Sequence, residues 1–292
     1  MLAFPNCKIN LGLYVTNRRD DGYHDLETVF YPLQLKESLE IVSAKETTLH
    51  LSGIPVAGSK ENNLVWKAYK LLKDKFPGKL PELDIYLHKV IPMGAGLGGG
   101  SANGAFMLQL LNDYGALGLH KEQLAGLALQ LGSDCPFFIY NTPHFASGRG
   151  EIMSPIPLDL SQYSIQLVCP DLHVSTAEAF KMIIPDPAPF DLRNLHKLPV
   201  EEWKDFISND FEAPVLKQHP QLAIIKETLY DQGALYASMS GSGSTIFGIF
   251  PKGRKANLDI DADHEDIYME AGEAIKRKSQ KKIADAEPEP AV

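Results

Sequence analysis

A dense run of glycines is the part of this chain whose residue types most directly suggest chemistry. Six of the 23 glycines lie between Gly94 and Gly104, in IPMGAGLGGGSANGAFML, just before an expected helix. Backbone N–H groups free of side chains, followed by a helix N-terminus with about half a positive charge, form a cradle for phosphate. The run therefore predicts binding of a triphosphate, and a glycine-rich turn without a ligand is the structural alternative.

Three widespread phosphate motifs do not account for this run. GAGLGG fits the dinucleotide fingerprint, but that fold needs a second parallel strand after the helix, and here a turn and another helix are expected through Leu131. No Lys-Ser or Lys-Thr pair closes the run as in a Walker motif, and the HRD and DFG signatures of protein kinases are absent from the sequence. We therefore expect a different architecture.

Lys8, Asn10 and Asp134 are candidates for chemistry on that phosphate. Lys8 and Asn10 are two residues apart in an alternating strand pattern, so both side chains point to its polar face. Asp134 lies in GSDCPFF, an acid among apolar residues where a helical pattern breaks off. The structural alternatives are a solvated strand face for the first two residues and a helix N-cap for Asp134.

Periodic patterns indicate the elements that must position these residues. The run at 7–15, CKINLGLYV, predicts a half-buried strand. The other elements expected before residue 155 are a strand at 27–35, a helix from Leu64 capped by Asn62 or Asn63, a strand at 82–93, and helices at 101–112 and 121–131.

A second unit is expected after residue 155. Its elements are a strand at 164–170, a capping box at Ser175 and Glu178, helices at 200–208 and 211–232, and a strand, glycine turn and strand at 237–250. The last residues contain KRKSQKK and ADAEPEPAV, typical of disordered ends. We therefore predict an N-terminal domain at 1–155, a C-terminal domain at 156–275 and a disordered tail at 276–292.

The composition narrows the class of protein. A formal net charge of −9 argues against charge-driven binding to nucleic acid and favours small-molecule partners. Three scattered cysteines cannot form a disulfide framework or a zinc site. The N-terminus lacks signal-peptide features, and no apolar run reaches about 18 residues. We expect a cytoplasmic protein, a monomer or weak homodimer, with neither nucleic acid nor membrane as a partner.

Three blocks, in order, resemble the motifs of the GHMP kinase superfamily, which includes galactokinase, homoserine kinase and mevalonate kinase. The blocks are CKINLGLYV, PMGAGLGGGSANGA and SGSGSTIFG, and the resemblance runs from about residue 4 to about residue 250. It implies an α+β fold of two domains, the first like domain 2 of ribosomal protein S5 and the second ferredoxin-like, with the active site in the cleft between them. It also implies transfer of the ATP γ-phosphate to a small-molecule alcohol with the help of Mg²⁺.

This resemblance assigns roles to individual residues. Asp134 would be the base that accepts the proton of the acceptor hydroxyl, and Lys8 would offset the charge that develops. Ser101 would also contact the magnesium, although the second serine that relatives often carry is Ala102 here. The residues implied to bind ATP are Pro92, Met93, Gly94, Ala95, Gly96, Leu97, Gly98, Gly99, Gly100, Ser101, Ala102, Gly241, Ser242 and Gly243.

Within the family, RRDDGYHDLETVF, GLGGGSANGA and GSDCPFF resemble the branch of isoprenoid (terpenoid) precursor synthesis by the non-mevalonate route, whose acceptor carries a cytidine diphosphate. An aromatic face beside a ring that can donate and accept hydrogen bonds suits a nucleobase. The residues implied to bind this acceptor are Asn10, Tyr23, His24, Phe30, Thr176 and Phe180.

Two other functions stay open at this level. One is another GHMP kinase, of the homoserine or mevalonate type, which would not need the Tyr23 and His24 pair. The other is a catalytically silent nucleotide-binding or RNA-binding module that keeps the S5-like fold. The net charge of −9 and the presence of both Lys8 and Asp134 favour an enzyme, because a binding module needs no base.

Overall fold

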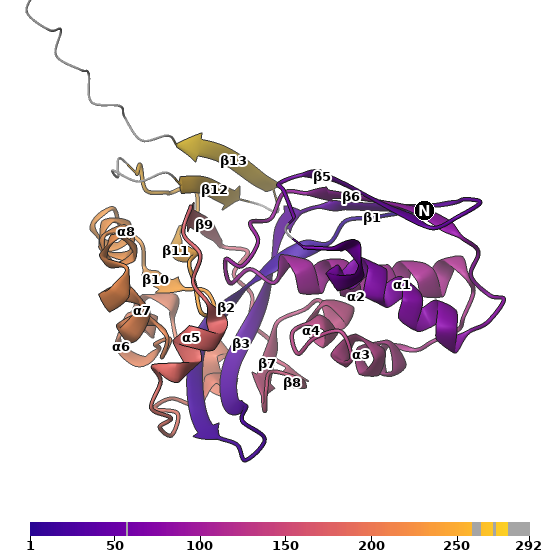
Figure 1. The fold of residues 1–292 in the computed structure, drawn as a ribbon. Helices are drawn as coiled ribbons and strands as arrows, with labels where there is room; N and C mark the ends of the chain where they lie inside the picture. The colour runs from indigo at the N-terminus through magenta and orange to yellow at the C-terminus, as the bar shows by residue number, and fades with distance from the viewer. Residues whose placement is uncertain (57, 259–263, 271–272, 280–292) are drawn as a thin grey trace, which may run out of the picture.

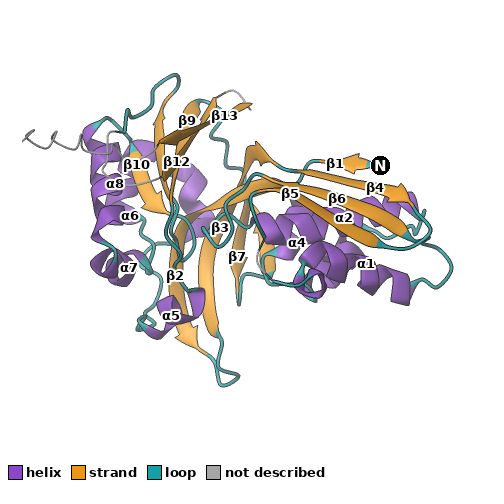
Figure 2. Ribbon diagram, turned by 45° about the horizontal axis from the view of Figure 1, so that its top comes forward, coloured by secondary structure: helices purple, strands orange, loops and turns teal. Residues whose placement is uncertain are grey.

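Three sheets and the helices packed on them make up the protein. We describe it from a computed structural model, which describes residues 1–56, 58–258, 264–270 and 273–279 (Figure 1). One sheet has the order β1-β4-β6-β5, formed by Leu2–Ala3, Ser38–Ser43, Leu83–Lys89 and Thr48–Gly53. The helices α1 (Leu64–Lys75), α2 (Gly99–Tyr114) and α4 (Cys135–Tyr140) lie along one face of it (Figure 2), with α3 (Lys121–Leu129) beside α4. In β6 the residues that alternate into this layer, Leu83, Ile85 and Leu87, are buried.

The central sheet carries the candidate catalytic strand. Its order is β2-β3-β7-β8, formed by Asn6–Arg18, His24–Lys36, His144–Ser147 and Ile152–Pro155. The alternating sequence predicted a strand with one buried face, but β2 is buried on both faces from Asn6 to Val15. The reason is its place between the N-terminal helices and the C-terminal sheet (Figure 1). The solvated face considered for Lys8 and Asn10 is therefore ruled out.

The C-terminal sheet is entirely antiparallel. Its order is β10-β11-β9-β12-β13, formed by Tyr236–Met239, Ile246–Pro251, Tyr163–Pro170, His264–Glu270 and Glu273–Ser279. The helices of this half are α5 (Thr176–Lys181), α6 (Trp203–Phe206), α7 (Glu212–Gln218) and α8 (Pro220–Asp231). Short 3₁₀ turns occupy Lys60–Asn62, Leu192–Lys197 and Val200–Glu202. The expected two-domain α+β fold with a cleft between the domains is confirmed.

Several expected elements differ in detail. The helix predicted at 211–232 is two helices, because Pro220 begins α8 and the preceding His219 is non-helical, with φ −128°. The helix predicted at 200–208 is a 3₁₀ turn followed by the four-residue α6. Asn63 caps α1 as predicted, whereas Ser175 makes only its half of the capping box, by accepting from the Glu178 N–H.

The predicted domain limits are not settled by the structure. Residues 276–279 of the expected tail form the end of β13, so the tail cannot begin at 276, and residues 280–292 lie outside the described part. One hydrophobic cluster joins Cys7 and Ile9 of β2 with Ile165 and Leu167 of β9, so apolar packing continues across residue 155. In the described part of the chain, none of the helices combines the length and apolarity needed to cross a membrane.

Candidate active site

The three glycine-bearing blocks of the sequence meet at one buried hydroxyl. Ser240 Oγ accepts a hydrogen bond from the Asn10 N–H at 3.3 Å and donates to the Gly96 carbonyl at 2.8 Å. The glycine run is held on the same side by β2, since the Lys8 N–H donates to the Leu97 carbonyl at 3.0 Å. These bonds bring residues 8–10, 96–97 and 240 together, although the sequence motif containing Ser240 had predicted only its glycines and Ser242 for the site.

Most glycines of the run are required by close packing within the protein. Gly96 has φ +78°, and a Cβ there would lie 1.9 Å from the Ser240 carbonyl oxygen. Gly98 has φ +71°, and its Cβ would lie 3.1 Å from Lys8 Cε. Of the six, Gly100 alone has no neighbour within 4 Å of such a Cβ. Positive φ angles and close packing within the protein therefore account for most of these glycines, as in the alternative of a glycine-rich turn, and only Gly100 is left with open space beside it.

Lys8 and Asp134 form an ion pair at the floor of the site. Lys8 Nζ lies 3.5 Å from Asp134 Oδ2, and the exposed fractions of the two side chains are 4% and 35%. Asp134 precedes α4, but its side chain makes no capping hydrogen bond, so the helix-cap alternative is not borne out. Although Asp134 lies among apolar residues in the sequence, its carboxylate is partly exposed, and Lys8 is the buried partner. Burial lowers the pKa of Lys8, and Asp134 opposes that shift.

Neighbouring polar groups fix the direction of the Lys8 side chain. Lys8 Nζ donates to Asn10 Oδ1 at 2.6 Å, and Asn10 Nδ2 donates to Thr28 Oγ1 at 3.0 Å. The ammonium also lies 5.0 Å from the centre of the Phe30 ring. Because Asn10 uses its amide on Lys8 and Thr28, it positions the lysine as well as facing the cleft.

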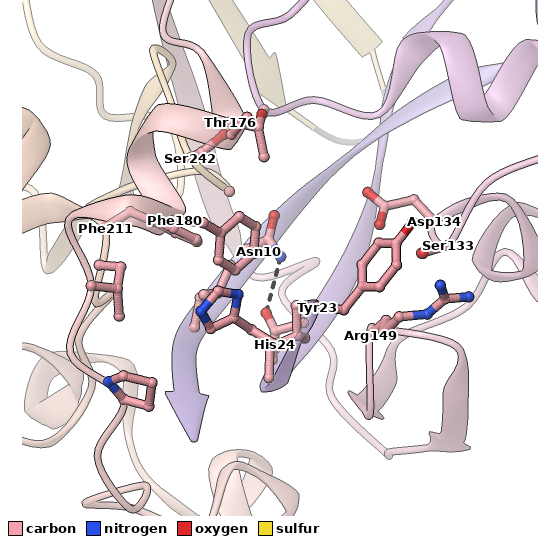
Figure 3. A pocket seen from close by; sticks show the side chains of 18 of the residues that line it. Asn10, Tyr23, His24, Ser133, Asp134, Arg149, Thr176, Phe180, Phe211 and Ser242 are labelled. Atoms are coloured by element: carbon pink, nitrogen blue, oxygen red, sulfur yellow. Dashed lines mark hydrogen bonds between the residues drawn. The ribbon is translucent and has the colours of Figure 1, made fainter. Parts of the chain in front are cut away.

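A cleft of about 1040 Å³ joins these residues to the rest of the predicted site (Figure 3). The predicted residues that line it are Lys8, Asn10, Tyr23, His24, Phe30, Gly94, Gly96, Gly98, Asp134, Thr176, Phe180, Gly241 and Ser242. Other residues predicted to bind ATP do not line this cleft, and they are Pro92, Met93, Ala95, Leu97, Gly99, Gly100, Ser101, Ala102 and Gly243. Leu97 and Ala102 face the protein core, so only their backbone could serve a ligand.

Aromatic side chains line the end of the cleft that was predicted to take a base. His24 stacks on Phe180, with ring centres 4.9 Å apart and planes 17° apart, and Phe180 meets Phe211 edge to face at 4.8 Å. Tyr23 is 56% exposed, and the guanidinium of Arg149 lies 4.7 Å from its ring centre (Figure 3). No third ring fits between His24 and Phe180 in this arrangement, whereas one face of Tyr23 is left open.

Cationic side chains and a second hydroxyl also line the cleft. Arg18, Arg149 and Lys181 face it, although the chain as a whole is acidic. Thr176 Oγ1 lies 2.9 Å from Ser242 Oγ, which links the aromatic end of the cleft to the glycine loop at residues 240–243. Arg149 was not predicted for the site, although its place between two glycines in GRGE was an available signal. These cations suit ligands that carry several phosphates.

The described residues contain no group of three or more His, Cys, Asp or Glu that could hold a metal by themselves. Mg²⁺ needs few protein ligands when substrate phosphates supply the others, so a site with one or two oxygens fits it. The candidates here are the Ser101 hydroxyl in the first turn of α2 and the Asp134 carboxylate. Ser101 also hydrogen-bonds the thiol of Cys135, whose burial raises its pKa to about 12.

Comparison with known proteins gives matches on both sides of the cleft. The family model described as GHMP kinases N terminal domain matches residues 63–142, and the model described as GHMP kinases C terminal matches residues 191–262. A curated 4-diphosphocytidyl-2-C-methyl-D-erythritol kinase from Parabacteroides distasonis is 51% identical over 252 residues, which cover 86% of this chain and 92% of the relative. Another from Bacteroides fragilis is 51% identical over 267 residues, covering 90% and 97%.

Solved structures agree with these sequence matches. A crystal structure of 4-(cytidine 5'-diphospho)-2C-methyl-D-erythritol kinase superimposes with a TM-score of 0.70 at 30% identity, covering 87% of this chain and 91% of that one. Mevalonate kinase from Methanococcus jannaschii superimposes with a TM-score of 0.63 at 14% identity, covering 86% and 90%, which shows a shared fold alone.

Proposed function

Because the chain belongs to the GHMP kinases, we propose that it transfers the γ-phosphate of ATP to the 2-hydroxyl of 4-diphosphocytidyl-2-C-methyl-D-erythritol, the compound in the names of its curated relatives. It is an ATP-dependent kinase whose acceptor is an alcohol, and its place is in isoprenoid precursor synthesis. The observation that carries the proposal is the Lys8 and Asp134 pair at the floor of a cleft bordered by two glycine loops.

The chemistry proposed for this chain's residues is a single in-line transfer. Asp134 accepts the proton of the acceptor hydroxyl as that oxygen forms its bond to the γ-phosphorus, while the bond from phosphorus to the β,γ-bridging oxygen breaks and ADP leaves. Lys8, held by Asn10, lies 3.5 Å from that carboxylate and stabilises the negative charge on the reacting oxygens. Residues 94–100, Gly241 and Ser242 hold the phosphates through backbone N–H groups, whereas the Gly243 N–H donates to the Ser240 carbonyl.

Magnesium is part of the proposal as the ion that accompanies ATP. Ser101 and the phosphates would hold the magnesium ion, which would neutralise part of the negative charge of the phosphates. Gly98 ends the loop in a left-handed conformation, and α2 starts directly after it. The backbone of Gly98, Gly99 and Gly100 would face the phosphates.

The acceptor would lie along the cationic part of the cleft. We propose that its base stacks on the open face of Tyr23 near His24 and Phe180, and that its diphosphate faces Arg149 and Lys181. We also propose a cytoplasmic enzyme, a monomer or weak homodimer, with one domain at about 1–155 and a second that begins at about 156 and includes β13, which ends at Ser279. Cys7, Cys135 and Cys169 are buried and form no disulfide within the described part of the chain, which fits a reducing compartment.

An ATP-consumption assay with three acceptors tests this function. We expect turnover with 4-diphosphocytidyl-2-C-methyl-D-erythritol and rates at least about a thousandfold lower with homoserine and mevalonate, because a site built for a polar base and a diphosphate rejects ligands that lack them. Turnover on mevalonate or homoserine but not on the cytidine compound would replace the proposed acceptor with that of another GHMP kinase. No turnover on any of them would favour a silent nucleotide-binding module.

The acceptor end of the cleft gives a second prediction. Replacing Tyr23 and His24 by Ala should raise KM for the cytidine-bearing acceptor by about tenfold to a hundredfold, because base stacking on an aromatic ring contributes about 1–3 kcal/mol. KM for ATP should stay within about twofold of the wild type. The matched control is Tyr86→Ala, since Tyr86 is also exposed and stacks on a histidine, His50, but lies on the sheet away from the cleft. Equal KM effects of the two changes would remove Tyr23 and His24 from acceptor binding.

A further inference from the structure

The buried carboxylate of Glu37 lies beside the start of the glycine run. Glu37 is the residue between β3 and β4 and is 2% exposed. Its Oε1 accepts hydrogen bonds from the backbone N–H groups of Val90 and Ile91, both at 2.9 Å. Its Oε2 accepts from Lys89 Nζ at 2.7 Å and from Asn103 Nδ2 at 2.6 Å. Both oxygens are therefore fully used on groups from two other elements.

These groups stand at the two ends of the loop that precedes α2. Val90 and Ile91 lead into residues 92–98, and Asn103 lies one turn into α2 where the loop has ended. Lys89 Nζ closes the arrangement by donating to Asn103 Oδ1 at 2.9 Å. Gly99 also packs on the entering end, since a Cβ there would lie 2.9 Å from Ile91. Glu37 thus fixes where the loop starts and where the helix begins.

The cost of this arrangement argues for a role beyond stability. Lys89 and Glu37 have side-chain exposures of 1% and 0%, and burial lowers the pKa of Lys89. Buried ion pairs are often replaceable by apolar residues of similar size without loss of stability. What apolar residues cannot supply is the acceptor for two adjacent backbone N–H groups.

A similar device holds the other glycine loop. Glu212 Oε1 accepts from the Met239 N–H at 2.6 Å and from Ser238 Oγ at 2.8 Å, just before the loop at 240–243. Its second oxygen pairs with Lys226. In both loops of the site, the backbone just before the loop donates hydrogen bonds to a glutamate, and that glutamate is paired with a lysine.

We propose that Glu37 is a positioning residue of the nucleotide site, which sets the backbone of residues 92–98 so that its N–H groups match the phosphates of ATP. The proposal rests on the proposed function in that it takes this loop to hold a nucleoside triphosphate. Glu37 acts through Val90, Ile91 and Asn103 and does not touch the ligand.

Two double variants that remove both buried charges of the Glu37 and Lys89 pair test the proposal. In Glu37→Gln with Lys89→Met, the Gln carbonyl still accepts from Val90 and Ile91. The Gln amide can donate to Asn103 Oδ1 once the Asn103 amide has turned over, which the loss of Lys89 Nζ allows. In Glu37→Met with Lys89→Met, size is kept but no acceptor remains. We expect the second variant to bind a non-hydrolysable ATP analogue about tenfold more weakly than the first, since two hydrogen bonds to the loop are lost. Binding of cytidine diphosphate should be the same in both.

Equal affinity of the two double variants for the ATP analogue, or an equal loss for cytidine diphosphate, would overturn the positioning role. If the Met variant does not fold, Glu37→Asp serves, because it keeps the charge beside Lys89 but withdraws the carboxylate by one methylene. Glu37→Asp should then bind the ATP analogue severalfold more weakly than the wild type, and an unchanged affinity would contradict the proposal. The affinity for the ATP analogue is measured without an acceptor. If the proposed acceptor is wrong, that error appears only in the turnover assay of the wild type, and the two proposals fail separately.

Discussion

Asp134→Asn should lower turnover by about a hundredfold to ten-thousandfold, the usual contribution of a general base. The amide is isosteric with the carboxylate, but it cannot take the proton of the acceptor hydroxyl. The Asp134 side chain makes no capping hydrogen bond to α4, so affinity for an ATP analogue should stay near that of the wild type. The melting temperature should fall by a few degrees, because the buried Lys8 ammonium loses its carboxylate partner.

Asp191→Asn is the matched control for this change. Asp191 also precedes a helical turn, but its carboxylate does cap it, by accepting from the Arg193 N–H at 3.1 Å, and it does not line the cleft. The control should turn over normally and keep its free energy of unfolding within about 1 kcal/mol of the wild type, because Asn caps a helix about as well as Asp and the exposed pair with Arg193 contributes little. Near-normal turnover of Asp134→Asn would remove Asp134 from the mechanism and leave its pairing with Lys8 as structural.

The sequence could predict most elements because each has a local cause. The alternation in β6 and the helical spacing in α1 both reflect one buried face, and Asn63 is a local cap. The split at Pro220 was also readable, since proline starts helices and restricts the preceding residue. The burial of both faces of β2 was not readable, because it depends on the C-terminal sheet that the chain reaches 150 residues later.

The site shows the same division between local and long-range causes. Lys8 and Asp134 were predicted as separate candidates far apart in the sequence, and only the fold brings their charged atoms to within 3.5 Å. The glycine run was predicted as space for phosphate, whereas Gly96 and Gly98 are small because Ser240 and Lys8 lie against them. Glu37 carried no signal at all in the sequence, since its four donors come from residues more than fifty positions away.

Lys8→Met should separate activity from stability. Without the ammonium, turnover should fall by about a hundredfold to a thousandfold, as for loss of a charge that stabilises the transition state. The free energy of unfolding should stay within about 1 kcal/mol of the wild type, because the cost of burying the ammonium is removed while Asp134 remains partly solvated. Lys60→Met is the control, since Lys60 also lies over a ring, that of Trp66, but outside the cleft. A large loss of stability with normal residual turnover would make Lys8 structural.

The pH dependence of the Lys8 variants sharpens this separation. Burial lowers the pKa of Lys8 in the folded protein, so the ammonium is lost at a lower pH than in the unfolded chain. Between those two pKa values the unfolded state binds the extra proton, and stability relative to Lys8→Met should therefore rise with pH. Turnover should fall over the same window, because the charge that serves the reaction is being lost. Lys8→Arg should lack both trends, since its guanidinium stays protonated. Parallel changes of stability and turnover in the wild type would show that the buried charge of Lys8 does not serve catalysis.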